Sequence, residues 1–510
     1  MSADWEMMVR PEKSRLIAPV VLAALAAVCL PLSASAQHGP VYSVLSEFGD
    51  FVSCDTLAQG IVVVWWDKGN DLSARAAALL DSMAAYRQYC LDSLDMQDPP
   101  NPGDGYYYNV YIHETGDVFP DGWACGQGTD MYGYPYMTLP IGTVLGGDWM
   151  TISHEAFHVF QYSGDAPGFE DPDAWWYIEA SANWFAAVNY PVDPCAFVES
   201  RSLVHLPHVS MWLGYDNFPE YYPENWQRYV HQYAMALFLF YLTEEIGAPY
   251  SYICGCFYNG DGGGQSSSLP QDLLPQEYLY AALGGDQMRT CFTDWAAHMT
   301  NDFDFLLPSQ KEMAQEHWDT YADPADDNEF VLVLEDSGTG GWYRPPDSLT
   351  TTGWSFNTYR IRNGSTGTYS FHLLGDLFGS EADPACFRGA VLVKSVLAIP
   401  QFRDLEMISN TEGSLTLEVT AADTSLYLLV VSVPGTFTDV EQLFGYEVSI
   451  EKGPAGSEST CPGPEAPRLA RCIPNPFHHQ TKIEFEVPTA GPARLAIYDA
   501  RGRLVSILLE

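Results

Sequence analysis

The chain has 510 residues, of which 66 are acidic and 23 are basic, and its formal net charge is −43. At about 150 residues per domain, this length predicts roughly two to four domains with ample hydrophobic core. Because the strong negative charge repels other polyanions, it argues against nucleic acids and anionic membranes as partners.

The first 36 residues have the pattern of a secretory signal peptide. Basic residues precede an apolar run, 16–30, and a small-x-small cleavage signature ends at Ala36. No later stretch of the sequence is long and apolar enough to span a bilayer. The sequence therefore predicts an exported protein, secreted or at the cell surface, without stable membrane insertion.

The cysteine content fits export. One of the 11 cysteines, Cys29, lies in the signal peptide, so ten remain after its removal. An even number of cysteines in an exported chain predicts disulfide bonds. Cys461 and Cys472 lie near one Pro/Gly-rich linker and form a candidate pair, while the other pairings stay open.

The mature chain begins with alternating strand and helix signals. Runs of β-branched and aromatic residues predict strands, and a run rich in Ala and Leu predicts a helix. The expected order is strand, helix, strand, strand, at residues 60–66, 72–90, 106–112 and 136–139.

The next stretch, 151–161, contains an H-E-x-x-H sequence within an apolar helical pattern that Asp148 can cap. Residues four apart lie on one face of a helix, so His154 and His158 can direct two imidazole nitrogens at one ion. Glu155 lies beside a ligand without being one, where its carboxylate can take a proton from a zinc-bound water. The pattern predicts a zinc hydrolase.

A third protein ligand must come from elsewhere in the chain. Gln161 and Gly164 stand where one class of H-E-x-x-H proteins has a glycine and a third histidine. A second helix is expected over 171–189, and it places Glu179 among apolar and aromatic residues, which is unusual for a surface carboxylate and makes Glu179 a candidate for the third ligand. The next candidates are carboxylates at the start of this helix: Glu170, Asp171 and Asp173.

The sequence W-x-x-E-A-x-A-x-W at 176–184 resembles the W-x-x-E-G-x-A-x-W form of the gluzincins, with Ala180 where glycine is more usual. Gluzincins are the thermolysin-like and aminopeptidase-like branch of zincins, in which a metal-ligating Glu follows H-E-x-x-H by about twenty residues. The resemblance implies that Glu179 is the third ligand. The resemblance covers roughly residues 145–190. It implies a zincin-like domain with a mixed sheet in its N-terminal half and helices in its C-terminal half. It also implies an edge strand that pairs with an extended peptide substrate.

The region that follows is expected to be mainly helical, with one helix from Pro223 to Gly247 and others at about 274–283 and 287–300. Gluzincins take a Tyr or His from a later helix to stabilise the oxyanion. Tyr233 and His231 are two helical positions apart, about 200° around the axis, so they cannot both face the site. We favour Tyr233, which precedes small and apolar residues as in the Tyr-Gly helix of related peptidases, and His231 is the alternative.

From residue 329 the sequence pattern changes to that of short strands separated by turns, which predicts a β-sandwich. The sandwich resembles the accessory jelly-roll domains of exported bacterial peptidases. Near the C-terminus, an N-P-F opening and a Y-D-x-x-G-R-x-V hairpin resemble the sorting domain of type IX secretion cargo, or the similar immunoglobulin-like FlgD domain. That domain normally has further strands, so a truncated copy is expected, with the secretion machinery as a partner.

Together these features predict an α+β protein in five parts. The parts are a signal peptide (1–36), a zincin-like metallopeptidase domain (37–325), a β-sandwich (329–452), a linker (453–468) and a partial sorting or immunoglobulin-like domain (469–510). The predicted function is secreted zinc-dependent hydrolysis of peptide bonds in a protein or peptide substrate. The alternative is a surface binding or adhesion protein that keeps the zincin fold with little or no hydrolytic activity.

Overall fold

The computed structural model divides into two compact units, one of residues 36–455 and one that combines 1–35 with 456–510. It describes residues 48–99, 108–119, 122, 124–162, 164, 172–193, 195–218, 226–258, 273–301, 303–321, 331–332, 335–336, 341–361, 366–375, 384–395, 400–437, 442–453, 468–473, 482–486, 495–498 and 504–509. The expected signal peptide lies outside the described residues.

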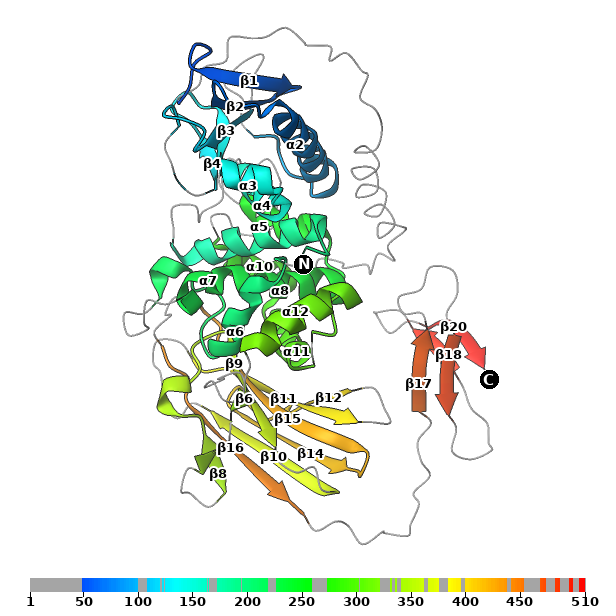
Figure 1. Cartoon of the computed structure of the whole chain (residues 1–510). Helices are drawn as coiled ribbons and strands as arrows, with labels where there is room; N and C mark the ends of the chain where they lie inside the picture. The colour runs from blue at the N-terminus through cyan, green and yellow to red at the C-terminus, as the bar shows by residue number, and fades with distance from the viewer. Residues whose placement is uncertain are drawn as a thin grey trace. The chain divides into compact units, whose positions relative to one another are not determined.

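The larger unit begins with a mixed five-stranded sheet in the order β1-β2-β3-β5-β4 (Figure 1). Its strands are β1 (Cys54–Gln59), β2 (Val62–Asp67), β3 (Tyr108–His113), β4 (Cys125–Thr129) and β5 (Pro135–Pro140). The three central strands β2, β3 and β5 are parallel, whereas β1 and β4 pair antiparallel at the two ends of the sheet. Every residue of β2 and β3 is buried, as expected for parallel strands that are covered on both faces.

The predicted strands and first helix of this region are confirmed. The helix expected at 72–90 is α2 (Ser73–Ser93), which crosses between the parallel strands β2 and β3 and packs on β2. The two end strands β1 and β4 were not predicted. Because β1 is half-exposed and mixed in polarity and β4 is short and contains two glycines, neither has the apolar run that marks a buried strand.

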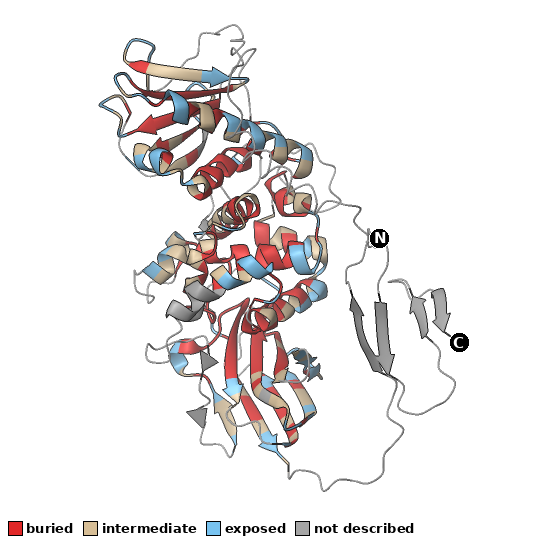
Figure 2. Ribbon diagram, turned by 45° about the vertical axis from the view of Figure 1, so that its right-hand side comes forward, coloured by how far each residue is buried: buried red, intermediate tan, exposed pale blue. Residues whose placement is uncertain are grey.

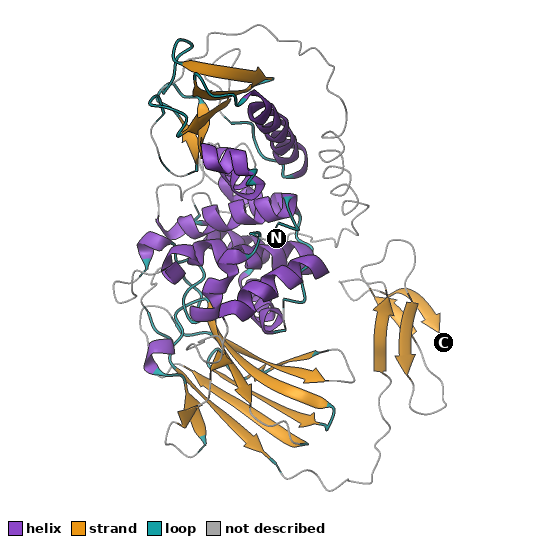
Figure 3. Cartoon of the chain, viewed as in Figure 1, coloured by secondary structure: helices purple, strands orange, loops and turns teal. Residues whose placement is uncertain are grey.

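A largely helical layer follows the sheet (Figure 3). Its α-helices are α3 (Ile141–Gly146), α4 (Trp149–Gln161), α5 (Trp175–Asn189), α6 (Ser202–His205), α7 (Trp226–Ala234), α8 (Ala236–Phe240), α9 (Tyr250–Cys254), α10 (Pro275–Leu283), α11 (Gly285–Thr300) and α12 (Pro308–Tyr321). The helices predicted at 274–283 and 287–300 are confirmed as α10 and α11. Buried residues concentrate along the faces that these helices turn toward one another (Figure 2).

One predicted helix is not continuous in the structure. The helix expected from Pro223 to Gly247 is broken into α7 and α8 at Met235 and continues as a π-helical turn, Tyr241–Glu245. Within that turn the Thr243 hydroxyl donates to the carbonyls of both Leu239 and Phe240, at 3.1 and 3.2 Å. A side-chain hydroxyl that bonds back to the preceding turn competes with the regular backbone ladder, which accounts for the distortion at this point.

The predicted β-sandwich is confirmed as two packed antiparallel-rich sheets. Their orders are β13-β14-β10-β16-β8-β7 and β12-β11-β15-β9-β6. The strands are β6 (Val331–Leu332), β7 (Glu335–Asp336), β8 (Trp342–Arg344), β9 (Ser355–Ile361), β10 (Gly367–Gly375), β11 (Phe387–Ser395), β12 (Gln401–Asp404), β13 (Glu406–Met407), β14 (Glu412–Val419), β15 (Asp423–Ser432) and β16 (Tyr446–Lys452). Apolar residues from both sheets, among them Phe371, Val391 and Leu428, fill the space between them.

The sandwich and the helical layer share a core. Trp354 stacks on Phe437, with 5.3 Å between ring centroids, and its ring lies 5.6 Å from that of Phe292 on α11. The Met211 N–H donates to the Trp354 carbonyl (3.1 Å), so backbone bonding also joins the two parts. The boundary expected near 325–329 therefore marks a change of secondary structure within one apolar core.

The smaller unit contains two antiparallel hairpins among its described residues. β17 (Arg468–Ile473) pairs with β18 (Lys482–Glu486), and β19 (Leu495–Tyr498) pairs with β20 (Leu504–Leu509). Strands were expected here, and the resemblance to a sorting domain stays a prediction. Within the part of the chain that the structure describes, no helix combines the length and apolarity that crossing a membrane requires.

The expected disulfide bonds are not formed among the described side chains, where eight cysteines carry free thiols. Cys54, Cys90, Cys254 and Cys256 are buried, and burial raises the pKa of each of these thiols. A protonated buried thiol packs as a small apolar group, so these cysteines belong to the hydrophobic core. The candidate pair of Cys461 and Cys472 lies outside the described side chains.

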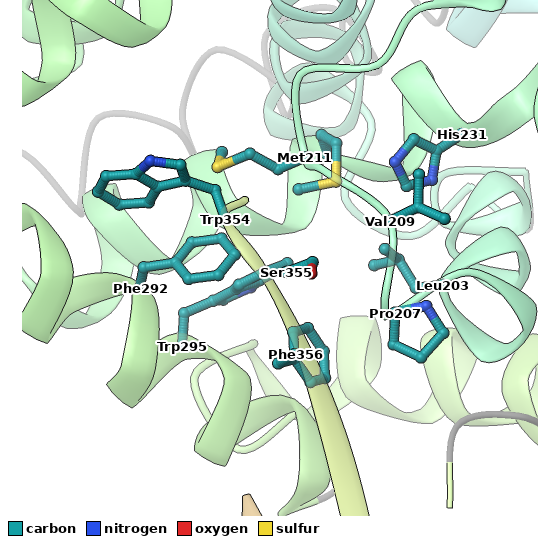
Figure 4. Close-up of a pocket in the computed structure, with 11 residues that line it drawn as sticks. Leu203, Pro207, Val209, Met211, His231, Phe292, Trp295, Trp354, Ser355 and Phe356 are labelled. Carbon is teal, nitrogen blue, oxygen red and sulfur yellow. The ribbon is translucent and has the colours of Figure 1, made fainter. Parts of the chain in front are cut away.

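Two buried histidines lie where the sandwich meets the helices. His231 is fully buried and lines a small cavity together with Trp354 and Phe356 (Figure 4). The His208 carbonyl accepts a hydrogen bond from the Thr352 N–H (3.0 Å). Burial lowers the pKa of His208 to about 3, helped by repulsion from His231, and burial lowers the pKa of His231 to about 4. Both imidazoles are therefore neutral in the folded protein.

Acidification should destabilise this protein through His208 and His231. Both pKa values lie below the unfolded value of about 6.5, so the unfolded chain binds more protons and the free energy of unfolding falls as pH drops from about 6.5 to about 4. Urea unfolding across this range measures the slope. His231→Gln keeps a donor but cannot titrate, so it should flatten the slope, and an unchanged slope would contradict the assignment.

Candidate functional site

The site is built on α4, whose start matches the sequence prediction. The Asp148 carboxylate accepts from the Thr151 N–H (3.1 Å) and from its hydroxyl (2.8 Å), which caps the helix. The apolar stripe predicted for this helix is buried, with Ile152 and Ala156 fully inaccessible. This packing fixes the rotation of α4, so that His154 and His158 both face α5.

Three ligand atoms meet between α4 and α5. The Nε2 atoms of His154 and His158 lie 2.9 Å apart, and Oε2 of Glu179 lies 3.1 Å from the first and 3.5 Å from the second. Ligand atoms around a tetrahedral ion with bonds of about 2.0–2.1 Å lie roughly 3.3 Å from one another. Within the described residues, this is the group of His, Cys, Asp or Glu side chains that could hold a metal ion.

The outer nitrogens of both imidazoles are held by carboxamide oxygens. Nδ1 of His154 lies 2.8 Å from Oδ1 of Asn183, and Nδ1 of His158 lies 2.7 Å from Oε1 of Gln161. Because an oxygen of this kind only accepts, each Nδ1 carries the hydrogen and each Nε2 turns a lone pair inward. Two lone pairs and a carboxylate that face one another repel unless a cation or a proton lies between them. The donor set therefore fits a divalent metal ion.

The pKa shifts of His158 and Glu179 also indicate that this group favours positive charge among its members. Burial alone would lower the pKa of His158, but the charge of Glu179 and the hydrogen bond to it outweigh burial and raise that pKa to about 9. Burial would raise the pKa of Glu179, but His158 and His154 outweigh it and hold the pKa of this carboxyl well below its usual range. Glu179 is thus ionised throughout the neutral range.

Glu155 also lies at this site but is not one of the three residues that could bind the metal ion. Its carboxylate oxygen Oε2 accepts a hydrogen bond from the Gly126 N–H on β4 (2.6 Å), and the side chain is buried. Gly126 must be glycine at this contact, because a Cβ atom would lie 2.2 Å from the Glu155 carbonyl oxygen and 2.6 Å from Cβ of His158. The sheet therefore contributes to the site by holding the Glu155 carboxylate beside the ligands.

The two candidate oxyanion donors lie in different places. The Tyr233 ring is 5.8 Å from the ring of His154, and burial followed by the charge of Glu179 raises the pKa of Tyr233 well above its ordinary value. Its hydroxyl is therefore a neutral donor beside the group. His231 instead places Nε2 3.2 Å from the Ser210 carbonyl, in the contact with the sandwich. Of the two, Tyr233 is near the ligand group.

Sequence reasoning missed four residues of this site. Asn183 follows Glu179 by four positions and Tyr162 follows His158 by four, so each shares a helix face with a ligand, a spacing that sequence alone contains. The ring of Tyr162 lies 6.5 Å from that of His158. Gln161 follows His158 by three positions on the same helix, but its two partners on α5 have no local signal. Nothing local identifies Gly126, because its partner comes from α4.

Among the other carboxylates considered as third ligands, the structure describes Asp173, which is not part of the group. Asp173 accepts a hydrogen bond from the Asn217 side chain (2.8 Å). Glu170 and Asp171 lie outside the described residues. Glu179 is the carboxylate that the structure brings to the two histidines.

The fold and the site define a mixed α+β protein with a His-His-Glu group that could bind a metal ion. A family model described as a family of unknown function (DUF6055) matches residues 62–449, which is most of the chain, and the protein belongs to that family. No curated protein matches. Among solved structures, the chain is similar to the pre-peptidase C-terminal domain of collagenase from Bacillus anthracis, with 12% identity and a TM-score of 0.16 over 24% of this chain and 92% of that one.

Glu179→Ala should lower the affinity for divalent metal ions by at least roughly tenfold, because it removes one of three ligands and the only negative charge among them. Competition against a chromophoric chelator measures the dissociation constant. Glu244→Ala is the matched control, since Glu244 is an exposed carboxylate that accepts from the Tyr250 hydroxyl (3.0 Å) and is not a member of the group. Equal losses in the two variants would show a general charge effect and exclude Glu179 as a ligand.

Proposed function

We propose that this protein is a zinc-dependent peptidase of the gluzincin type. The observation that carries the proposal is the position of Glu155, a carboxylate that lies next to the His154, His158 and Glu179 group and is held there by a backbone N–H from the sheet. Two imidazoles and one carboxylate form a donor set that suits zinc and leaves a position open for water. A carboxylate beside such a group suits hydrolysis better than metal storage.

The proposed chemistry divides among the residues of the site. A zinc ion bound there would lower the pKa of a water molecule and polarise the scissile carbonyl. Glu155 takes a proton from the attacking water and delivers it to the leaving amine. Tyr233, whose raised pKa keeps the hydroxyl protonated, donates a hydrogen bond to the oxygen that becomes negative. The Gly126 N–H holds the Glu155 carboxylate in position during these steps.

A peptide substrate is supported by the place of β4. This strand ends the five-stranded sheet, pairs antiparallel with β5 on its inner side, and contacts α4 through Gly126. A strand at the end of a sheet can accept an extended peptide through main-chain hydrogen bonds. A peptide in that position would pass the Glu155 carboxylate and the ligand group.

Export belongs to the same proposal. The pattern of residues 1–36 and the C-terminal resemblance to a sorting domain support a secreted or surface location, with the secretion machinery as partner. An extracellular peptidase requires such a route. Detection of the mature chain in culture medium, with an N-terminus after Ala36, tests it.

The second candidate function is a surface binding protein that keeps the metal group without hydrolysis. The β-sandwich favours this binding function, because it is a large second part of the fold that contributes no residue to the metal group. Zinc content and hydrolysis of denatured casein separate the two candidates. One bound zinc ion with zinc-dependent cleavage supports the peptidase, whereas one bound zinc ion without cleavage supports the binding protein.

Glu155→Gln should keep zinc bound while the turnover number falls by roughly a hundred- to ten-thousandfold, because the change removes the proton acceptor but no ligand. The amide oxygen of the substituted side chain can still accept from the Gly126 N–H, so the fold should persist. Zinc content and casein hydrolysis are measured on the same preparation. Near-native turnover, or loss of zinc, would overturn the role given to Glu155.

Tyr233→Phe should lower kcat by roughly ten- to a thousandfold at unchanged zinc content, because it deletes only the hydroxyl. Tyr162→Phe is the matched control, since burial and the charge of Glu179 also raise the pKa of Tyr162, to about 12, and its ring lies near His158. Wild-type kinetics in Tyr233→Phe with a loss in Tyr162→Phe would transfer the role to Tyr162. A collapse confined to His231→Ala would transfer it to that histidine.

A further inference from the structure

Gln161 makes three hydrogen bonds that join the two ligand-bearing helices. It lies at the end of α4, three residues after His158, and its side chain is fully buried. Its Oε1 lies 2.7 Å from Nδ1 of His158. Its Nε2 donates to the Ile178 carbonyl (2.9 Å) and to the Ser181 hydroxyl (2.7 Å), both on α5. Ile178 is the residue directly before the ligand Glu179.

These partners require a carboxamide. The backbone carbonyl of Ile178 can only accept, so it orients the Gln161 amide with Nε2 toward α5 and Oε1 toward His158. An ionised glutamate would lack the donor for α5, and an apolar side chain would lack the acceptor for the imidazole. Burial makes either loss costly, because a buried polar group without its partner costs about 1–3 kcal/mol.

We propose that Gln161 is a positioning residue with two separable effects. Its acceptor sets the tautomer of His158 and so determines how tightly the centre binds zinc, whereas its donor joins α4 to α5 and stabilises the folded chain. The inference rests on the metal site of the proposed function but does not require hydrolysis. By accepting from Nδ1, Gln161 leaves the Nε2 lone pair for the metal ion. By donating to Ile178 and Ser181, it joins α4 to α5 and stabilises the folded chain whether or not zinc is bound.

Asn183 supports the same inference from the other histidine. Its Oδ1 lies 2.8 Å from Nδ1 of His154, so both ligand imidazoles are oriented by neutral carboxamides. A carboxylate in such a position raises the basicity of the imidazole, whereas a carboxamide orients it without adding negative charge. With Glu179 as the one charged ligand, the centre with zinc keeps a net positive charge.

Variants of the full chain separate the acceptor of Gln161 from its donor. Gln161→Met keeps the length and removes both functions, so the dissociation constant for zinc should rise by roughly ten- to a hundredfold. Gln161→Glu keeps the acceptor and loses the donor, so it should bind zinc at least as tightly as the wild type while the metal-free protein melts at a lower temperature. Chelator competition with zinc measures the first quantity and thermal unfolding measures the second.

Gln276→Met is the matched control. Gln276 is 1% exposed, against 0% for Gln161, and its carboxamide also bonds on both sides, with Trp176 Nε1 (3.0 Å) and the Asp173 carbonyl (3.1 Å). It contacts neither histidine, so this variant should lose stability while keeping wild-type zinc affinity. Unchanged zinc affinity in Gln161→Met overturns the proposal, and so does an equal loss in Gln276→Met.

If Gln161→Met does not fold, the zinc affinity of Gln161→Glu still tests the proposal. A loss of zinc affinity of tenfold or more in that variant would show that packing, and not the acceptor, matters at this position. Failure of the proposed function would give a different result. A chain without peptidase activity can still show the expected ranking of zinc affinities among the wild type, the Gln161 variants and Gln276→Met. A wild-type chain that binds no zinc would instead remove the metal site itself.

Discussion

The site depends on an unfavourable contact that the protein maintains. Two imidazole lone pairs and one carboxylate face each other across 2.9–3.5 Å between α4 and α5. Such a group repels itself unless positive charge lies among its members, and burial makes the repulsion stronger because the local dielectric is low. The bonds around it act against that repulsion: Asn183 and Gln161 hold the outer nitrogens of the rings, and Gln161 ties α4 to α5.

The sheet and the helices keep this contact in place from different sides. β4 approaches α4 closely enough that Gly126 leaves no room for a side chain, and its N–H meets the Glu155 carboxylate. On α5 itself, the aromatic residues Trp176 and Trp184 are fully buried, which fixes the rotation of that helix and therefore the direction of Glu179. Precise placement of ligand atoms requires rigid elements, and the site is built on two helices and a strand rather than on loops.

A fold of this kind does not by itself assign an activity, because one architecture supports many functions. The family to which the chain belongs has no known function, so the chemistry of the residues carries the argument. The β-sandwich adds no member to the metal group but shares its apolar core with the helical layer through Trp354 and Phe437. It therefore stabilises the region that carries the site, and the buried His208 and His231 make that contact sensitive to acid.

The sequence by itself determined the elements whose signals are local. Helix α4 could be placed from its Asp148 cap, its apolar stripe and its stop, and the two histidines and Glu155 follow from helical periodicity alone. The parallel strands and the sandwich were also predictable, because buried or alternating apolar runs mark them. The strand β1 was missed since it is half-exposed, and β4 was missed since it is short and contains two glycines. The π-helical turn at Tyr241–Glu245 was missed since the Thr243 hydroxyl competes there with backbone bonds that any helix would make.

Only the tertiary structure decided which distant residues meet. Whether Glu179 reaches the histidines depends on how α5 crosses α4, and no periodicity within either helix specifies that crossing. Which of Tyr233 and His231 lies near the metal group depends on which side of α7 faces α4, because both residues occupy plausible helical positions. Two partners of Gln161 and the Gly126 partner of Glu155 lie on other elements. Among the described residues, the disulfide bonds expected from cysteine parity are not formed, and most of the cysteines are buried thiols. Local periodicity determines which face of a helix is apolar or polar, whereas packing determines what that face meets.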